Sequence, residues 1–207
     1  VGLGPVPAEI RSPEGPANDA YMALRQGRGL GGNRVQLLEH TGAMLRLQDQ
    51  DRVWVKQIKA ALMENRFRLV QQPIASLVGE DLGMFDVLLR MLDEKGQEVL
   101  PSVFMPAAER NDLMKNIDRW VIGAAMSFCT ARKPGALFVR LSQESLSDST
   151  LPAWLDNQIK ITRAEPARIV FQVREEAASP LIKDAVALHQ ALHKRGFRFA
   201  IEGFGLG

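Results

Sequence analysis

The sequence has very little cysteine and very little net charge. Its 207 residues include one cysteine, Cys129, which excludes an internal disulfide and fits a reducing compartment. The net charge of +2 comes without a dense run of Lys and Arg, so a nucleic-acid groove is not favoured. No apolar stretch approaches the roughly 20 residues of a membrane span, and no signal-peptide pattern opens the chain. We therefore expect a cytoplasmic protein without a membrane span.

The sequence also lacks an initiator Met and a closing helix. It begins at Val1 and ends with FRFAIEGFGLG (197–207), an apolar strand that runs directly into a glycine turn. In parallel α/β proteins, sites are built on the turns that follow the carboxyl ends of strands. We expect a fragment of a longer protein at both ends, with part of a site at its C-terminal end.

From residue 67 onward, apolar segments alternate with segments of helical periodicity. The expected strands are 67–74, 85–92, 136–142, 168–174 and 197–201. The expected helices are 52–66, 111–131, 151–161 and 180–195, the last with Ser179 and Pro180 at its start and Gly196 after its end. Strands that are apolar throughout are typical of sheets covered on both faces. The pattern predicts an α/β fold of βα repeats, with fewer strands than the eight of a closed barrel.

Two motifs suggest chemistry that their context does not support. GRGLGG (27–32) matches a dinucleotide-binding pattern, but a helix precedes it and a strand follows, which is the reverse of the required order. His189 and His193 share one helix face, yet Gln190 stands where a zinc protease needs Glu and no third ligand is evident. We interpret the first as a turn and the two histidines as surface residues.

The segments from residue 67 resemble the EAL domain, a (β/α)8 TIM-type barrel that binds cyclic di-GMP and, in active members, hydrolyses it. The resemblance rests on seven stretches in the order of the family. They are LVQQPI (69–74), DVLLR (86–90), LPSVFMPAAER (100–110), NIDRWVI (116–122), FVRLS (138–142), FQVREE (171–176) and AIEGFGLG (200–207). DVLLR stands where the family has Glu-Ala-Leu and an Arg. The resemblance implies an incomplete EAL barrel.

The first part of the chain resembles the end of a GGDEF domain. ANDAYMALRQGRGLGGNRV (17–35) is similar to the closing segment of that family, although the match is looser. This resemblance predicts three parts: a degenerate GGDEF tail over 1–40, a connector and linker helix over 41–66, and a degenerate EAL domain over 67–207.

The positions that hold two divalent metals in active EAL enzymes are altered in this sequence. The resemblance places these degenerate positions at Asp86, Arg140, Gln172, Glu202 and Gly203. The first carboxylate is shortened, an Asn becomes a cation, a Glu becomes an amide, and a closing Asp-Asp pair becomes Glu-Gly. Because Mg²⁺ requires near-octahedral oxygen ligands and a fixed guanidinium repels it, we expect no metal, no cofactor and no phosphodiesterase activity.

The positions that hold the nucleotide match the family better. The resemblance implies a site for cyclic di-GMP made by Gln72, Leu88, Leu89, Arg90, Pro101, Phe104, Glu109 and Asp118. Arg90 suits a phosphate oxygen, Glu109 and Asp118 suit the donors of a guanine edge, and Pro101 and Phe104 suit packing on purine or ribose. Arg140 is a further candidate, because its charge could replace that of the metals. Taken singly, Leu88 and Phe104 are also typical core residues.

The sequence thus predicts a catalytically inactive EAL domain that acts as a cyclic di-GMP receptor, resembling the FimX-like kind of degenerate GGDEF–EAL protein. That resemblance implies a PilZ-domain protein as partner and a role in type IV pilus biogenesis and twitching motility, and leaves a homodimer open. Two alternatives remain: an active cyclic di-GMP phosphodiesterase with an unusual metal set, and an interaction scaffold that binds no nucleotide. Arg140 and Gly203 argue against the first, and Gln72, Arg90 and Asp118 against the second.

Overall fold

The computed structural model describes residues 40–80 and 82–205. The predicted GGDEF tail and the GRGLGG motif lie outside these residues, apart from His40 at the boundary. The chain divides into two compact units, Val1–Arg52 and Val53–Gly207. The sheet, its covering helices and the candidate site all belong to the second unit.

Helix α2 (His40–Met63) is longer than the helix predicted over 52–66. Its C-terminal half has the expected apolar face, and Ile58 and Ala61 are fully buried in the core of the second unit. The segment 41–50, predicted as a connector, is helical instead. It lacks a sustained apolar stripe, and such a stripe was the signal that located the helix in the sequence.

One mixed sheet forms the centre of the second unit, with the strand order β1-β2-β4-β5-β6 and a short β3 paired to β2. The strands are β1 (Phe67–Ile74), β2 (Met84–Leu92), β3 (Glu98–Val99), β4 (Ala136–Arg140), β5 (Ile169–Arg174) and β6 (Arg198–Glu202). Strands β2, β4, β5 and β6 are parallel to one another. Within the described residues the sheet is open, so the closed barrel remains an expectation.

The first strand departs from the predicted βα repeat, because β1 pairs with β2 in the antiparallel direction. Only residues 75–83 separate the two strands. A parallel connection needs a crossover of about a dozen residues or more, whereas a short loop can join antiparallel neighbours. The sheet is therefore mixed rather than wholly parallel.

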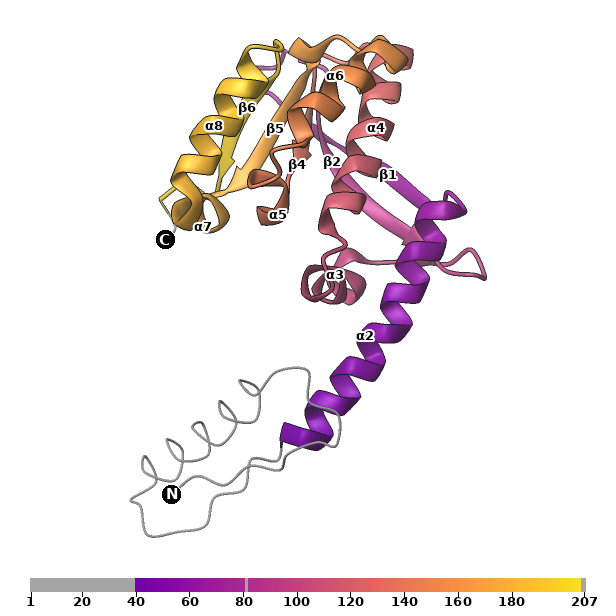
Figure 1. Ribbon diagram of the computed structural model, residues 1–207. Coiled ribbons are helices and arrows are strands. Elements are labelled where there is room, and N and C mark those ends of the chain that lie inside the picture. The colour runs from indigo at the N-terminus through magenta and orange to yellow at the C-terminus, as the bar shows by residue number, and fades with distance from the viewer. Residues whose placement is uncertain (1–39, 81, 206–207) are drawn as a thin grey trace. The chain divides into compact units, whose positions relative to one another are not determined.

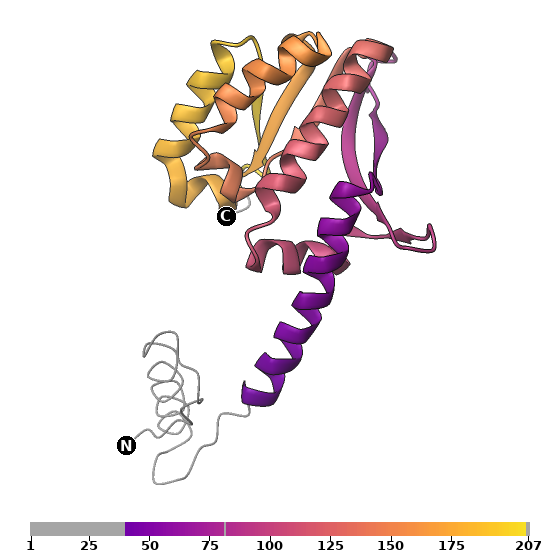
Figure 2. The same ribbon diagram turned by 45° about the vertical axis from the view of Figure 1, so that its right-hand side comes forward.

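The principal helices after the first two strands are α3 (Pro101–Arg110), α4 (Met114–Arg132), α6 (Leu151–Thr162) and α8 (Ile182–His193). Helices α4, α6 and α8 lie side by side on one face of the sheet (Figures 1 and 2). Each has an apolar stripe, as the periodicity of its sequence predicted, and buries it against the strands. This face holds the hydrophobic core.

Short helical segments connect the longer elements. They are α5 (Gln143–Leu146), η1 (Pro166–Arg168), α7 (Glu175–Ala178) and η2 (Ser179–Leu181). Helix α8 begins at Ile182, after the 3-10 turn η2, so Ser179 does not cap it as the sequence suggested. Gly196 follows α8 with a φ of 82°, a left-handed conformation that glycine adopts without strain.

Alternation along the parallel strands separates apolar from polar side chains. Val139, Phe171 and Val173 are fully buried on the helix-covered face, where each contributes about 1.5–3 kcal/mol by leaving water. Their neighbours Arg140 and Gln172 point to the opposite face, since successive side chains in a strand alternate. The helix-covered face thus holds the core, while the opposite face carries these polar groups beside apolar residues such as Phe138 and Val170.

Candidate functional site

Four of the five degenerate metal positions meet on the polar face of the sheet. Asp86 lies on β2, Arg140 ends β4, Gln172 lies on β5 and Glu202 ends β6. The parallel pairing places them on one face, because Arg140 is in register with Gln172 and each lies an even number of residues from the other register partners. The structure therefore brings together residues that are up to 116 positions apart (86 to 202).

These four side chains bind one another. Arg140 donates from Nε to Glu202 Oε2 at 2.5 Å and from its terminal nitrogen to Glu202 Oε1 at 2.9 Å. The same terminal nitrogen lies 3.5 Å from Asp86 Oδ2. Gln172 donates from Nε2 to Asp86 Oδ1 at 2.9 Å. The guanidinium therefore links the two carboxylates, and the amide completes the network.

The contact between Arg140 and Glu202 favours the charged form of both groups. The hydrogen bonds from Arg140 hold the pKa of Glu202 below its ordinary value, with partial burial acting in the opposite direction. The same hydrogen bonds raise the pKa of Arg140 further above its already high value. Both groups are therefore ionised at neutral pH, as an ion pair with charge-assisted hydrogen bonds.

This donor set does not fit two divalent cations. The carboxylates of Asp86 and Glu202 already accept hydrogen bonds from Gln172 and Arg140. A fixed positive charge stands between them, where it would repel a metal ion at short range. Gly203 supplies no side chain and has a φ of 69°. Among residues 40–80 and 82–205, no three His, Cys, Asp or Glu side chains are grouped so as to hold a metal ion.

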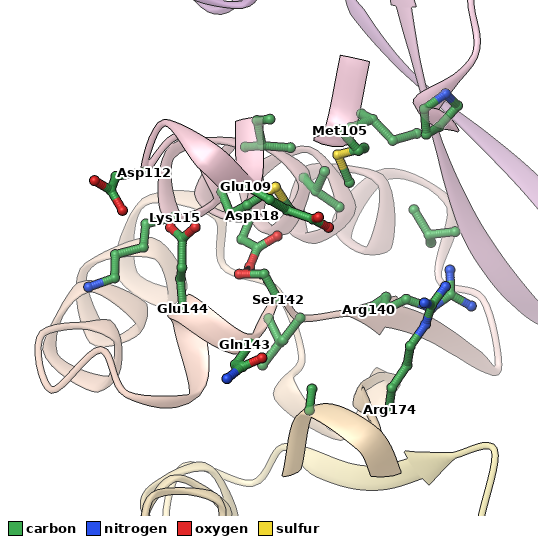
Figure 3. A pocket seen from close by; sticks show the side chains of 18 of the residues that line it. Met105, Glu109, Asp112, Lys115, Asp118, Arg140, Ser142, Gln143, Glu144 and Arg174 are labelled. Atoms are coloured by element: carbon green, nitrogen blue, oxygen red, sulfur yellow. Dashed lines mark hydrogen bonds between the residues drawn. The ribbon is translucent and has the colours of Figure 1, made fainter. Parts of the chain in front are cut away.

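A pocket of about 1160 Å³ lies beside this network. Its walls come from β2, from helices α3 and α4, and from the segments that follow β4 and β5. Six of the eight predicted ligand-binding residues line it: Leu88, Leu89, Arg90, Pro101, Glu109 and Asp118. Arg140 lines it as well. Figure 3 shows Glu109, Asp118, Arg140 and Arg174 around this cavity, each from a different element.

Arg90 is the predicted phosphate-binding residue in this pocket. Its guanidinium donates to its neighbour's carbonyl, Leu89 O, at 2.8 Å, and its Nε lies 3.9 Å from Glu98 Oε2. The ion pair is long and its carboxylate is mostly exposed, so it holds Arg90 only weakly. The remaining guanidinium donors can therefore serve an anion.

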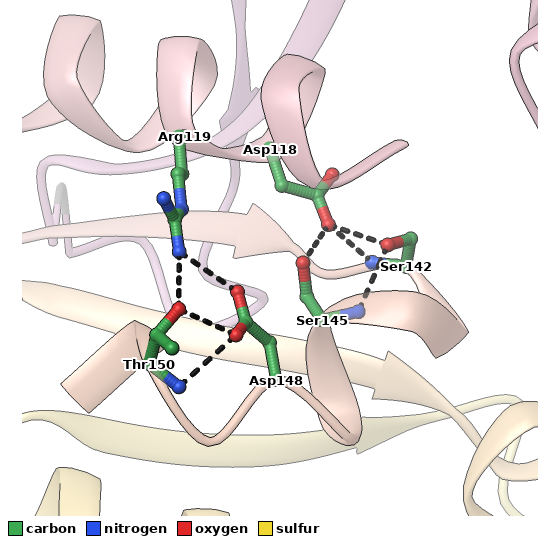
Figure 4. Close-up of polar contacts among 6 residues, drawn as sticks. All are labelled: Asp118, Arg119, Ser142, Ser145, Asp148 and Thr150. Atoms are coloured by element: carbon green, nitrogen blue, oxygen red, sulfur yellow. Dashed lines mark hydrogen bonds and ion pairs between the residues drawn. The ribbon is translucent and has the colours of Figure 1, made fainter. Parts of the chain in front are cut away.

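Asp118 is buried, with 5% of its surface exposed. Its Oδ2 accepts three hydrogen bonds: from Ser142 N at 2.8 Å, from Ser142 Oγ at 2.6 Å and from Ser145 Oγ at 2.6 Å (Figure 4). The two serines lie at the start of α5, where Ser142 is the N-cap residue. Asp118 is thus held on one side by protein donors while its side chain lines the pocket.

Two predicted ligand residues lie outside the pocket. Phe104 is fully buried and packs against Phe67, with 6.0 Å between ring centroids. Its ring packs toward Phe67 of β1 and does not line this cavity, so its packing on purine or ribose stays a prediction. Gln72 is exposed on β1, in register with Asp86, and does not line the pocket.

Sequence reasoning missed several residues of the pocket. Ser142, Ser145, Lys115 and Arg174 received no role, yet Ser142, Lys115 and Arg174 line the cavity and Ser145 holds one of its walls. Ser142 could have been found, since it is the last residue of the predicted strand 136–142, inside FVRLS. Arg174 closes the predicted strand 168–174, a position typical of site residues in parallel sheets.

The two histidines that share a face of α8 lie at the surface. His189 and His193 are exposed on α8 and stack on each other, with 6.0 Å between ring centroids. Within the described part of the chain, no helix is both long enough and apolar enough to cross a membrane.

Comparisons with known proteins define the family. The EAL domain model matches residues 55–207, and the chain therefore belongs to the EAL domain family. The chain is similar to the EAL domain of FimX from Pseudomonas aeruginosa, solved with cyclic di-GMP bound. The sequence identity is 38%, the TM-score is 0.70, and the match covers 74% of this chain and 63% of that one.

Two further relatives are also proteins of cyclic di-GMP. The FimX EAL domain of Xanthomonas citri, solved in complex with cyclic di-GMP, is 25% identical with a TM-score of 0.69, over 78% of this chain and 64% of that one. The cyclic di-GMP phosphodiesterase PdeF of Escherichia coli is 30% identical over 181 residues, which is 84% of this chain and 24% of PdeF. The chain thus spans about a quarter of that relative.

Proposed function

We propose that this chain is a catalytically inactive EAL domain that binds cyclic di-GMP and relays its presence to a protein partner. The network of Asp86, Arg140 and Glu202 carries the proposal, because it fills the degenerate metal positions with an internal ion pair. Without the metals, no bound hydroxide is generated to attack a phosphate. The adjacent pocket retains Arg90 and Asp118, which suit the phosphate and the guanine.

The chemistry of the pocket supports a metal-independent receptor. Arg90 and Arg174 line the cavity and can face a phosphate without a bound cation, while carboxylates that also line it, such as Asp118, offer acceptors to a base. Leu88 offers a half-buried apolar surface to a base, and Pro101 another to a base or ribose. A cyclic dinucleotide has both features, two negative phosphates and two flat bases, and the pocket volume of about 1160 Å³ is ample for it.

The partner and the pathway follow from the resemblance to FimX. The 38% identity to the Pseudomonas aeruginosa domain favours the receptor over the alternative phosphodiesterase. On this basis we infer a PilZ-domain protein as partner and a role in type IV pilus biogenesis and twitching motility. The identity of 30% to PdeF keeps hydrolysis as the alternative to be tested.

Titration calorimetry tests the proposal directly. The purified protein is titrated with cyclic di-GMP in EDTA and again in Mg²⁺, and the nucleotide is analysed afterwards by chromatography. We expect binding of similar affinity in both buffers and recovery of intact ligand. Recovery of linear pGpG would establish an enzyme instead. Absence of binding in both buffers would leave a scaffold without nucleotide.

A further inference from the structure

Asp118 is a buried carboxylate whose two oxygens lie in different surroundings. Oδ2 accepts all three hydrogen bonds that the side chain receives within the described residues, from Ser142 N, Ser142 Oγ and Ser145 Oγ. Oδ1 accepts none of them and is not among the buried polar atoms that lack a partner. Because Asp118 lines the pocket, Oδ1 is the oxygen available to a ligand.

The fold fixes the two serines firmly. Ser142 lies two residues after the end of β4 and caps α5, with its Oγ accepting from Ser145 N at 3.3 Å. The other end of the same segment is held by Arg119, the residue next to Asp118 on α4. Arg119 donates to Asp148 Oδ2 at 2.9 Å and to Thr150 Oγ1 at 2.6 Å (Figure 4). Consecutive residues of α4 therefore hold the segment 142–150 at both ends.

The serine donors also bear on the charge of the carboxylate. Burial raises the pKa of Asp118, and the hydrogen bonds from Ser142 and Ser145 oppose that rise. An ionised carboxylate only accepts hydrogen bonds, whereas a protonated one must place a donor on one of its oxygens. The serines thus favour the form in which Oδ1 is an acceptor toward the pocket.

We propose that Ser142 and Ser145 are positioning residues that hold Asp118 so that Oδ1 accepts a hydrogen bond from the N–H edge of guanine. This inference rests on the proposed function, because it assigns one end of the nucleotide to this wall of the pocket. Guanine presents N–H donors on its Watson–Crick edge, while adenine presents an acceptor at N1, which a carboxylate repels. Serine positioning therefore makes the pocket selective for guanine, since a buried acceptor left unpaired disfavours the wrong base.

Calorimetry with two nucleotides tests this role. Wild type, S145A, D118N and the double variant D118N/S145A are each titrated with cyclic di-GMP and with cyclic di-AMP. We expect S145A to bind cyclic di-GMP about tenfold more weakly, as for a lost hydrogen bond to a charged group, and to lose part of its preference over cyclic di-AMP. In the D118N background, S145A should add little, because coupled residues are not additive.

Ser127 supplies the control. It lies on α4, the helix that carries Asp118, but its hydroxyl donates to Gly123 O at 3.0 Å and it does not line the pocket. S127A should leave both the affinity and the preference unchanged. S145T keeps the hydroxyl and should bind within about twofold of wild type, which decides the question even where D118N fails to fold. Circular dichroism verifies the fold of every variant.

The outcomes separate this inference from the proposed function. If the wild-type protein binds no cyclic di-GMP, the proposed function fails and the inference fails with it. If the wild type binds but S145A retains full affinity and preference, only the inference fails. It is equally overturned if S145A and D118N are additive, or if S145T is as weak as S145A, because the loss would then come from packing.

Discussion

Arg140 and Glu202, the last residues of two different strands, form a two-point ion pair. The two nitrogen–oxygen distances are 2.5 and 2.9 Å, and Asp86 lies 3.5 Å from the same guanidinium. In an active EAL domain the equivalent positions surround metals, by the resemblance described above. Here the positive charge at the carboxyl ends of the strands is a side chain of the protein itself. The side chains of this network connect β2, β4 and β6.

This ion pair makes a testable contribution to stability at low pH. Because the pKa of Glu202 is lowered in the folded state, its contribution is present above the unfolded value of 4.5 and is lost as the pH falls through the lowered value. E202Q removes the titrating group, so the variant should lose less stability than wild type between pH 7 and a pH below 4.5. Urea unfolding at the two pH values measures the difference.

Glu165 provides the control for that experiment. It pairs with Arg168 at 2.8 Å on the surface, where its side chain is 59% exposed. Exposed pairs contribute little, so E165Q should keep the pH dependence of wild type. An E202Q variant with the same acid sensitivity as wild type would contradict the contribution assigned to Glu202.

Replacing Arg140 by Asn should create a response to Mg²⁺. R140N leaves Asp86 and Glu202 without their shared cation, and two carboxylates with a nearby amide oxygen are ligands that Mg²⁺ accepts. We expect R140N to unfold at a lower temperature than wild type in EDTA and to recover part of the loss in Mg²⁺. The melting temperature of wild type should not depend on the metal.

R195N is the matched control, since Arg195 makes the same two-point contact with Asp156, at 2.7 and 2.8 Å. Only one carboxylate is released there, so R195N should be insensitive to Mg²⁺. If Mg²⁺ shifts the melting temperatures of R140N and R195N equally, Asp86 and Glu202 do not form a metal site when Arg140 is removed.

Much of the fold was predictable because its signals are local. The helix predicted over 151–161 is observed as Leu151–Thr162, and the strand predicted over 168–174 is observed as Ile169–Arg174. The helix has apolar residues at helical spacing, and the strand is a short, nearly continuous apolar run. The antiparallel β1 was not predicted, since the direction of a strand depends on its connection rather than on its own residues.

The site was predictable in its residue types and not in its contacts. Arg90 and Asp118 were assigned to the ligand from matching motifs, and the structure places both in the pocket. The ion pair between Arg140 and Glu202 joins residues 62 positions apart, so no local pattern in the sequence predicts it. Phe104 was assigned to the ligand and is found buried in the core, because an aromatic ring in a motif suits either place.

The core position of Phe104 makes its own prediction. F104A removes a fully buried ring packed on Phe67 and should destabilise the protein by about 3–5 kcal/mol. F104L keeps most of the volume, so it should fold and bind cyclic di-GMP with an affinity close to that of wild type. Urea unfolding and calorimetry measure the two effects. A folded F104L with strongly reduced affinity would return Phe104 to the ligand site.

Arg90 should be the residue whose loss weakens cyclic di-GMP binding most. A guanidinium can bind a phosphate through two parallel N–H donors, and a lost charged hydrogen bond costs about 1.5–3 kcal/mol. R90A should therefore bind about ten- to hundredfold more weakly. R90K keeps the charge without the fork and should fall between R90A and wild type.

Arg68 is the control for Arg90, because it lies directly opposite on β1, at the same register position of the antiparallel pair. Its guanidinium donates to the carbonyls of Asn65 and Phe67, both at 2.7 Å, and it does not line the pocket. R68A removes the same charge from the same pair of strands, so it should leave the affinity nearly unchanged in calorimetry. If R68A and R90A weaken binding equally, the effect is general electrostatic attraction of the dinucleotide, and the specific contact of Arg90 with a phosphate is refuted.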